Sequence, residues 1–112
     1  MKALGLVFSD AAIADILEQS DWYAQRVGRS LAKRWEACVT STLLKIARRP
    51  GASSSCDFGP EELRGTRRTP VAGFPKHLIF YQARASEILI LRVVHGARDL
   101  ESLFSEGASS ES

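Results

Sequence analysis

The chain has 112 residues, of which 45% are hydrophobic and 25% charged, and its formal net charge is +2 at pH 7. These are the values of one ordinary globular domain, and they exclude two domains, a mainly disordered chain and a coiled-coil rod. The longest uninterrupted apolar runs, such as Ile88–Leu91, fall far short of the ~20 residues of a membrane helix.

The charged residues are unevenly distributed. All 15 Lys and Arg residues precede residue 99, whereas the end of the chain carries only carboxylates: Asp99, Glu101, Glu106 and Glu111. A basic body is compatible with an anionic partner, although solvated charges on a small domain explain the same pattern.

The N-terminus and the two cysteines bear on the cellular compartment. The apolar stretch within residues 1–8 is short for a secretory signal and runs directly into a helix-start signal, so we expect a cytoplasmic protein. Cys38 and Cys56 lack metal-type spacing and are expected to be two reduced, unpaired thiols.

The first predicted elements are a strand and an amphipathic helix. Apolar residues alternate over 4–8, which predicts a short strand. Ser9 or Asp10 offers an N-cap for the helix that follows, and Gly28 is expected to end it. Its expected buried stripe repeats at three- and four-residue spacing: Ile13, Ile16, Leu17, Ser20, Ala24 and Val27.

A second helix is predicted to start at the Ser30 cap and to end before Pro50, because proline disfavours helical geometry in the residue before it. The short connection makes the two helices an antiparallel hairpin. The buried stripe of this helix is expected to be Leu31, Trp35, Cys38, Val39, Thr42, Leu43 and Ile46.

Strand signals dominate the second half of the chain. Residues 50–62 are expected to form a loop, because Pro, Gly and Ser dominate their composition. Residues 63–71 predict a weak, basic strand that Pro70 confines to an edge. Residues 76–82 and 87–95 predict two stronger strands joined by a short polar link.

The order of elements defines the fold class. Consecutive helices followed by consecutive strands predict an α+β domain, with the helical hairpin on one face of a small antiparallel sheet. Asp99 is expected to cap a short helical turn that ends at Phe104. We therefore expect a single domain over residues 1–104 and a disordered tail over 105–112.

The hairpin of the two strong strands predicts which side chains share a sheet face. With the turn centred on the polar link, Tyr81 lies opposite Ile88 and His77 lies opposite Arg92. The face with His77, Tyr81 and Arg92 is expected to be open. The other face is expected to pack on the helices and consists of Leu78, Phe80, Leu89, Leu91 and Val93.

Arginines near that open face are the main candidates for binding. An arginine inside an apolar strand needs a partner, so Arg92 indicates either a structural salt bridge or an anion site. Arg64, Arg67 and Arg68 cluster on the weak strand, where they suit an acidic protein segment as well as nucleic acid.

Common signatures of enzymes and metal sites are missing from the sequence. It has no glycine-rich phosphate loop, no serine in a nucleophile elbow and no His/Cys spacing of a metal framework. We therefore expect neither a metal nor a cofactor.

Several segments together carry a resemblance to a known family. They are the opening residues 8–16, the basic strand 63–68, the stretch 71–81 and the hydrophobic strand with its ending, 88–99. The most specific piece is the ending His95-Gly96-Ala97-Arg98-Asp99. Over residues 3–104 the chain resembles the ParE branch of the RelE/ParE toxin superfamily.

This resemblance implies a plasmid- or chromosome-borne type II toxin whose activity arrests growth. It implies a tightly bound ParD-like antitoxin from the adjacent gene, DNA gyrase as the target, and operator DNA bound by the complex through the antitoxin. Gyrase inhibition is not itself an enzymatic activity. The residues expected to bind the target are Arg92, His95, Arg98 and Asp99, and those expected to bind the antitoxin are Arg64, Arg67, Arg68, Tyr81 and Arg92.

The resemblance leaves two alternatives open. The RelE branch cleaves mRNA on the ribosome, and here such a nuclease would use His77, Arg92, His95 and Arg98. Where many of those nucleases carry a tyrosine, this chain has Leu103-Phe104, and phenylalanine has no hydroxyl to exchange a proton. The remaining alternative is a non-toxic protein that only binds an antitoxin.

Overall fold

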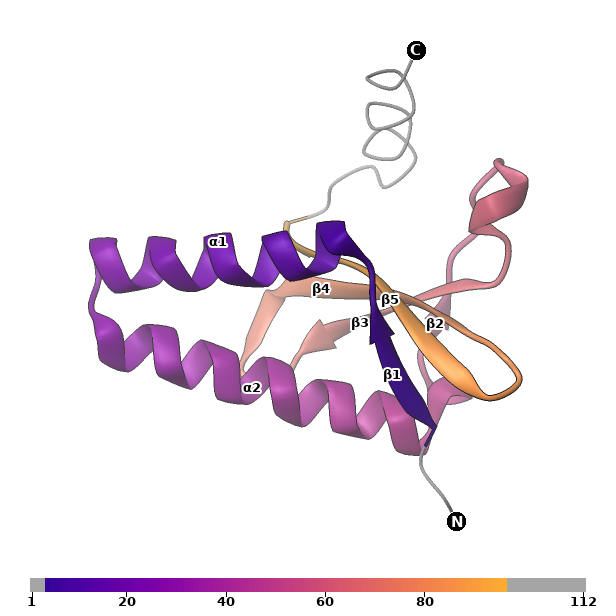
Figure 1. Ribbon diagram of the computed structural model, residues 1–112, viewed down its shortest axis with the longest axis horizontal. Coiled ribbons are helices and arrows are strands. Elements are labelled where there is room, and N and C mark those ends of the chain that lie inside the picture. Colours follow the sequence, from indigo (N-terminus) through magenta and orange to yellow (C-terminus); the bar gives the residue numbers. More distant parts are fainter. Residues whose placement is uncertain (1–3, 97–112) are drawn as a thin grey trace.

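The computed structural model describes residues 4–96 of the chain. Figure 1 shows two helices that run side by side in opposite directions, with the strands of the sheet behind them. The elements in chain order are β1 (Gly5–Phe8), α1 (Asp10–Arg26), α2 (Arg29–Arg48), the 3-10 turn η1 (Pro50–Ala52), β2 (Ser54–Ser55), the 3-10 turn η2 (Glu61–Leu63), β3 (Thr66–Val71), β4 (Phe74–Ala83) and β5 (Glu87–His95).

The α+β prediction is confirmed, and the sheet differs from it in one respect. The strand order is β1-β5-β4-β3-β2, in which β2, β3, β4 and β5 pair antiparallel. β1 instead runs parallel to β5, from Gly5 opposite Glu87 to Phe8 opposite Ile90. The sheet is therefore mixed, because the helical hairpin carries the chain from β1 across the sheet to the far edge.

Local sequence explains where the helices begin. The Ser9 side chain accepts a hydrogen bond from the Ala12 amide at 3.0 Å and so caps α1, as predicted. The Ser9 hydroxyl also donates to the Leu91 carbonyl at 2.7 Å, which ties the start of α1 to β5. The prediction of a Ser30 cap was wrong: α2 begins at Arg29, directly after Gly28 with its positive φ of 149°.

The main core lies between α2 and the helix-facing side of the sheet. Trp35, Val39 and Ile46 of α2 pack against buried side chains of β4 and β5, which include Ile79, Tyr81, Ile88 and Ile90. The stripe predicted for α2 is confirmed at Trp35, Val39, Thr42, Leu43 and Ile46.

The predicted buried stripe of α1 was largely wrong. Ile13 and Leu17 are 46% and 61% exposed, and Ala24 and Val27 are also exposed. Of the predicted stripe, Ile16 packs against the core, as predicted, and two residues outside that stripe, Ala12 and Tyr23, do so as well. The periodicity contained two overlapping apolar stripes, and spacing alone cannot choose between them.

Most of the predicted sheet faces are reversed in the structure, although Val93 packs on the helix side as predicted. His77 pairs with His95, Tyr81 pairs with Ile90, and a bulge separates Phe80 from Tyr81 in the β4–β5 register. His77 and Tyr81 therefore lie on the helix side, buried, together with Val93. A change in strand register combined with a bulge moves side chains to the opposite face of the sheet. The short link between the two strands determines neither the register nor the bulge.

The sequence predicted that one face of the sheet would be open. In the structure, the face away from the helices is covered as well. Phe80, Leu91 and Val94 are buried there in a second cluster. Cys56 and Phe58, from the segment predicted to be only a loop, pack against this cluster. That segment also contains η1, β2 and η2, which its composition did not predict.

Two further predictions concern the cysteines and the C-terminal residues. Cys38 and Cys56 are both free thiols, as predicted. The expected helical turn at 99–104 and the tail at 105–112 lie outside the described residues.

Candidate functional site

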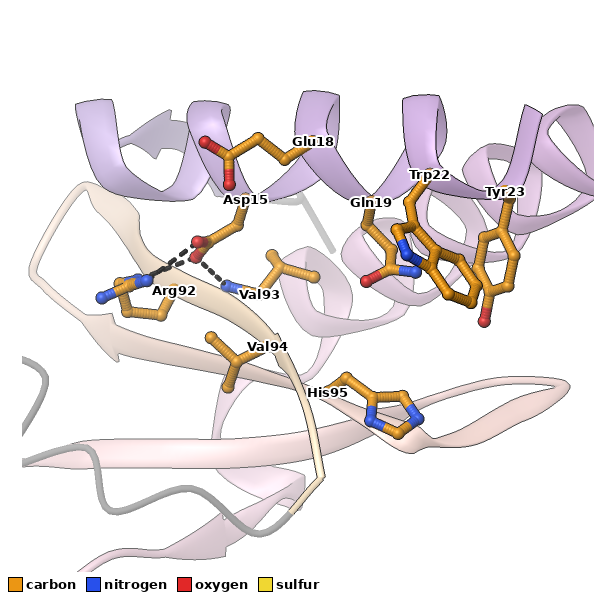
Figure 2. A pocket seen from close by; sticks show the side chains of 9 residues that line it. All are labelled: Asp15, Glu18, Gln19, Trp22, Tyr23, Arg92, Val93, Val94 and His95. Carbon is orange, nitrogen blue, oxygen red and sulfur yellow. Dashed lines mark hydrogen bonds and ion pairs between the residues drawn. The ribbon is translucent and has the colours of Figure 1, made fainter. Parts of the chain in front are cut away.

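A groove of about 720 Å³ lies between α1 and the C-terminal half of β5. In Figure 2, side chains of α1 point down towards side chains of β5, and together they form the two walls. The lining residues are Asp15, Glu18, Gln19, Trp22 and Tyr23 from α1, and Arg92, Val93, Val94 and His95 from β5. We call this the α1–β5 groove.

One end of the α1–β5 groove is fixed by an ion pair. Arg92 donates from Nε and Nη2 to the two carboxylate oxygens of Asp15, at 2.8 and 2.9 Å. Asp15 also accepts the backbone N–H of Val93 at 2.9 Å, and the contacts are drawn in Figure 2. Both side chains are mostly buried, with 18% and 11% of their surface exposed. Of the two functions open to Arg92, the geometry matches the structural salt bridge.

The other end is a cluster of aromatic and imidazole rings. The Tyr23 hydroxyl lies 2.9 Å from Nε2 of His77. His77 is 2% exposed and contacts the ring of Trp35 edge-on at 5.4 Å between centroids. Its cross-strand neighbour His95 is exposed, with the two imidazole centroids 4.7 Å apart. Only His95 of this pair is therefore open to a ligand in the groove.

Burial, together with the smaller effect of the nearby His95, lowers the pKa of His77 from its ordinary value of 6.5 to about 4. The ring is thus neutral at physiological pH. A neutral imidazole bonded to Tyr23 and enclosed by aromatic rings fits a packing role at the base of the groove.

We expect the free energy of unfolding to fall as the pH drops from 6.5 towards 4, because the unfolded chain binds a proton at His77 that the folded chain does not. Above pH 6.5 this contribution is fully present. One proton gives a slope of at most ~1.4 kcal/mol per pH unit. Urea denaturation of the wild type and of His77→Gln across this range measures the effect.

The control for this pH series is His95→Gln, which removes the exposed imidazole and should retain most of the slope. His77→Gln should flatten it. Identical pH profiles for the wild type and His77→Gln would contradict the assignment.

The three arginines predicted to form a cluster, Arg64, Arg67 and Arg68, have different partners in the structure. Arg64 forms an exposed ion pair with Glu61 at 2.8 Å. Arg67 donates from Nη1 to the Ser53 carbonyl at 2.6 Å. Arg68 lies near Cys56, where it partly offsets the rise that burial causes in the pKa of that thiol. These residues belong to the β2–β3 edge, two strands away from Arg92 on β5.

The other predicted site residues lie in different parts of the structure. Arg92 and His95 line the α1–β5 groove together, whereas His77 lies buried beneath it. Tyr81 is fully buried and donates to the Pro50 carbonyl at 2.7 Å, so the prediction that it lies on an open face was wrong. Arg98 and Asp99 lie outside the described residues.

Sequence reasoning missed Asp15 and Tyr23 as site residues. Neither residue belongs to the apolar stripe predicted for α1, and neither was named as a candidate. An available signal was the position of Asp15 next to Ile16, a residue of that stripe, in a chain that also has an arginine inside an apolar strand that requires a partner.

The described part of the chain shows neither a metal site nor a membrane-spanning helix. Within residues 4–96, no three His, Cys, Asp or Glu side chains are grouped so that they could hold a metal ion. Neither α1 nor α2 combines the length and the apolar character that a membrane-spanning helix requires.

Known structures share this architecture. The chain is similar to the chromosomal ParDE TA system from P. aeruginosa, with a TM-score of 0.68 and 18% identity over 85% of this chain and 98% of that one. It is also similar to the isolated E. coli RelE toxin, with a TM-score of 0.55 and 12% identity over 98% and 100% of the two chains. The YoeB dimer from Staphylococcus aureus matches with a TM-score of 0.55 and 17% identity over 86% and 100%. No curated protein sequence gives a significant match.

The fold is therefore that of the small RelE- and ParE-like toxins, a helical hairpin on a mostly antiparallel sheet. The family model for the ParE toxin of the type II toxin–antitoxin system parDE matches residues 6–100. The chain belongs to this ParE toxin family, and membership implies an antitoxin partner.

Proposed function

We propose that this toxin inhibits DNA gyrase in the bacterial cytoplasm and that a ParD-like antitoxin from the adjacent gene neutralises it. The observation that carries the proposal is the family match over residues 6–100. The α1–β5 groove adds to it, because two of the side chains that a ribonuclease would use there are engaged: His77 is buried and Arg92 is paired with Asp15.

A ribonuclease of the RelE type needs a base, an acid and a cation around one phosphate. Of the residues expected to supply them, His77 is 2% exposed and Arg92 is paired with Asp15. His95 is the one histidine within residues 4–96 that is exposed. These features favour gyrase inhibition over mRNA cleavage. Of the described residues expected to bind the target, they favour His95 over Arg92; Arg98 and Asp99 are proposed on the family resemblance alone.

We place the antitoxin on the helical hairpin rather than on the sheet. Exposed apolar side chains gather on the helices, and such patches mark interaction surfaces. They are Ile13, Leu17, Trp22 and Val27 on or next to α1, and Leu44 on α2. Tyr81, on the sheet face first expected to bind the antitoxin, is buried in the core beneath the helices.

Growth on induced expression tests the pairing of toxin and antitoxin. Induction should arrest growth, co-expression of the adjacent open reading frame should restore it, and the two products should purify together. A non-toxic binding protein would be purified with its partner but would not arrest growth. Arrest that no neighbouring gene relieves would contradict the partner model.

A variant at Leu17 tests the proposed antitoxin surface. Leu17 is 61% exposed, so Leu17→Lys should leave the toxin folded. Burying a leucine contributes about 1.5–3 kcal/mol, so antitoxin affinity should fall roughly tenfold to a hundredfold. Calorimetric titration measures the change. The control is Ala14→Lys, which adds the same charge at another exposed position of α1. Equal losses for both variants would contradict a role for the apolar patch.

A further inference from the structure

A second groove, of about 640 Å³, lies at the β2–β3 edge of the sheet, the edge opposite β1. Its walls are the C-terminal half of α2, the segment Ala52–Ser54 and the β3 residues Arg68–Pro70. We call it the α2–β3 groove. It shares no residue with the α1–β5 groove.

The α2–β3 groove is strongly basic. Its lining includes four cations and no carboxylate: Lys45, Arg48, Arg49 and Arg68. None of these four forms an ion pair with another residue of 4–96, where the ion pairs are Arg64 with Glu61 and Arg92 with Asp15. The hydroxyl-bearing residues Ser53, Ser54 and Thr69 also line it, whereas the hydroxyl of the buried Thr42 donates to the Cys38 carbonyl and accepts from the Ala72 amide.

Helix stability explains only part of this arrangement. Lys45 and Arg48 lie in the last turn of α2, where cations interact favourably with the helix dipole. That effect does not account for Arg68, which comes from β3, nor for the hydroxyls of the facing wall. The wall is itself held in place, because Arg67 donates to the Ser53 carbonyl. The groove thus brings cations from two elements together with hydroxyls on a fixed segment.

The backbone at this edge disfavours a peptide as the occupant. β2 pairs with β3 only at Arg67 and Arg68, so β3 lacks a neighbour beyond them. The next residue on that side of β3 is Pro70, which has no N–H to donate to an added strand. A protein segment would be anchored by large exposed apolar side chains. None of the residues that line the α2–β3 groove is such a side chain.

The residues that line the groove also favour double-stranded over single-stranded nucleic acid. No aromatic residue lines the groove, so it offers no platform on which unpaired bases could stack. Arginine, lysine, serine and threonine are the side chains that contact phosphates of a duplex backbone without reading its sequence.

We propose that the α2–β3 groove binds the sugar–phosphate backbone of duplex DNA. The choice of DNA rests on the proposed function, because gyrase holds duplex DNA while it acts. The toxin then engages the DNA beside the enzyme through this edge, while the helical hairpin remains the surface for the antitoxin. Binding is independent of sequence and strongly dependent on salt.

Fluorescence anisotropy with the full-length toxin and a short labelled DNA duplex tests the proposal over a series of salt concentrations. The test variant is Lys45→Gln with Arg49→Gln. The control is Arg29→Gln with Lys33→Gln at the start of α2, a pair with the same four-residue spacing in sequence, also exposed, and with the same change in charge. The test variant should bind the duplex more weakly, with a salt slope reduced by about 0.9 for each lost phosphate contact. The control should bind like the wild type.

Three results would overturn the proposal: equal weakening by the test and control variants, tighter binding of single-stranded DNA than of the duplex, and displacement of the duplex by poly-glutamate as readily as by unlabelled duplex. The last would identify an acidic protein segment as the ligand. The assay contains no gyrase, so a wild-type toxin that inhibits gyrase but does not bind the duplex refutes this inference alone. DNA binding without gyrase inhibition refutes the proposed function alone.

Discussion

Replacing Asp15 with alanine should lower the free energy of unfolding by about 3–5 kcal/mol, because it leaves a mostly buried Arg92 guanidinium without its carboxylate. The same change removes the acceptor of the Val93 amide. Asp15 thus joins α1 to β5 through three hydrogen bonds at a point where β1 has already ended. Urea denaturation of the purified variant measures the loss.

The matched control is Glu18→Ala, one turn further along α1. Glu18 lines the same groove and its removal changes the charge equally, but it is exposed. Its loss should therefore cost less than about 1 kcal/mol. Asp15→Ala and Glu18→Ala proteins of similar stability would contradict the structural role of the ion pair.

The loss of stability in Asp15→Ala has two possible causes: a charge left buried without its carboxylate, or the loss of stabilisation that the ion pair itself provides. A double variant distinguishes them. Removing both partners, as in Asp15→Leu with Arg92→Leu, should be less destabilising than Asp15→Ala, because no isolated charge remains buried. A double variant at least as unstable as the single one would show that the hydrogen bonds to the backbone and the pair itself carry most of the stabilisation.

The outline of the fold could be predicted from the sequence because strong local signals mark it. Ser9 can cap a helix through its hydroxyl, Gly28 can end one, and the apolar run of 87–95 has no competing helical spacing. The order of helices and strands then determines the fold class. These are properties of neighbouring residues, so a sequence reveals them.

The arrangement of side chains across the sheet could not be predicted in the same way. The bulge at Phe80 and Tyr81 and the pairing of His77 with His95 depend on contacts between strands. They decide that Tyr81 lies in the core and that Phe80 lies on the other face. The short polar link between the strands is compatible with several registers.

The candidate site was predicted only in part, for a related reason. Arg92 was found because a charged residue stands out inside an apolar strand, and His95 because it begins the ending that resembles the toxin family. Asp15, the partner of Arg92, is 77 residues away from it in sequence, and only the docking of α1 on β5 brings the two together. The grouping of Arg64, Arg67 and Arg68 with Arg92 failed because β4 lies between their strands.

The toxin's action on gyrase should be the most pronounced biochemical effect. Purified toxin added to gyrase, ATP and relaxed circular DNA should abolish supercoiling and leave DNA breaks covalently attached to the enzyme. Arg98→Ala should lose this inhibition while it keeps the wild-type unfolding midpoint and binds antitoxin normally. An Arg98→Ala toxin that is folded and fully inhibitory would remove Arg98 from the target-binding residues.

The measurement that tests the central proposal most directly sets this gyrase assay beside an assay with ribosomes programmed with mRNA, using the same toxin preparation. A ribonuclease would need a base and an acid, which contribute about 10²–10⁴-fold each, and His95 is the single exposed histidine within residues 4–96. We predict trapped gyrase–DNA breaks and intact mRNA. Cleaved mRNA with unimpaired gyrase would contradict the proposed function and establish the ribonuclease alternative.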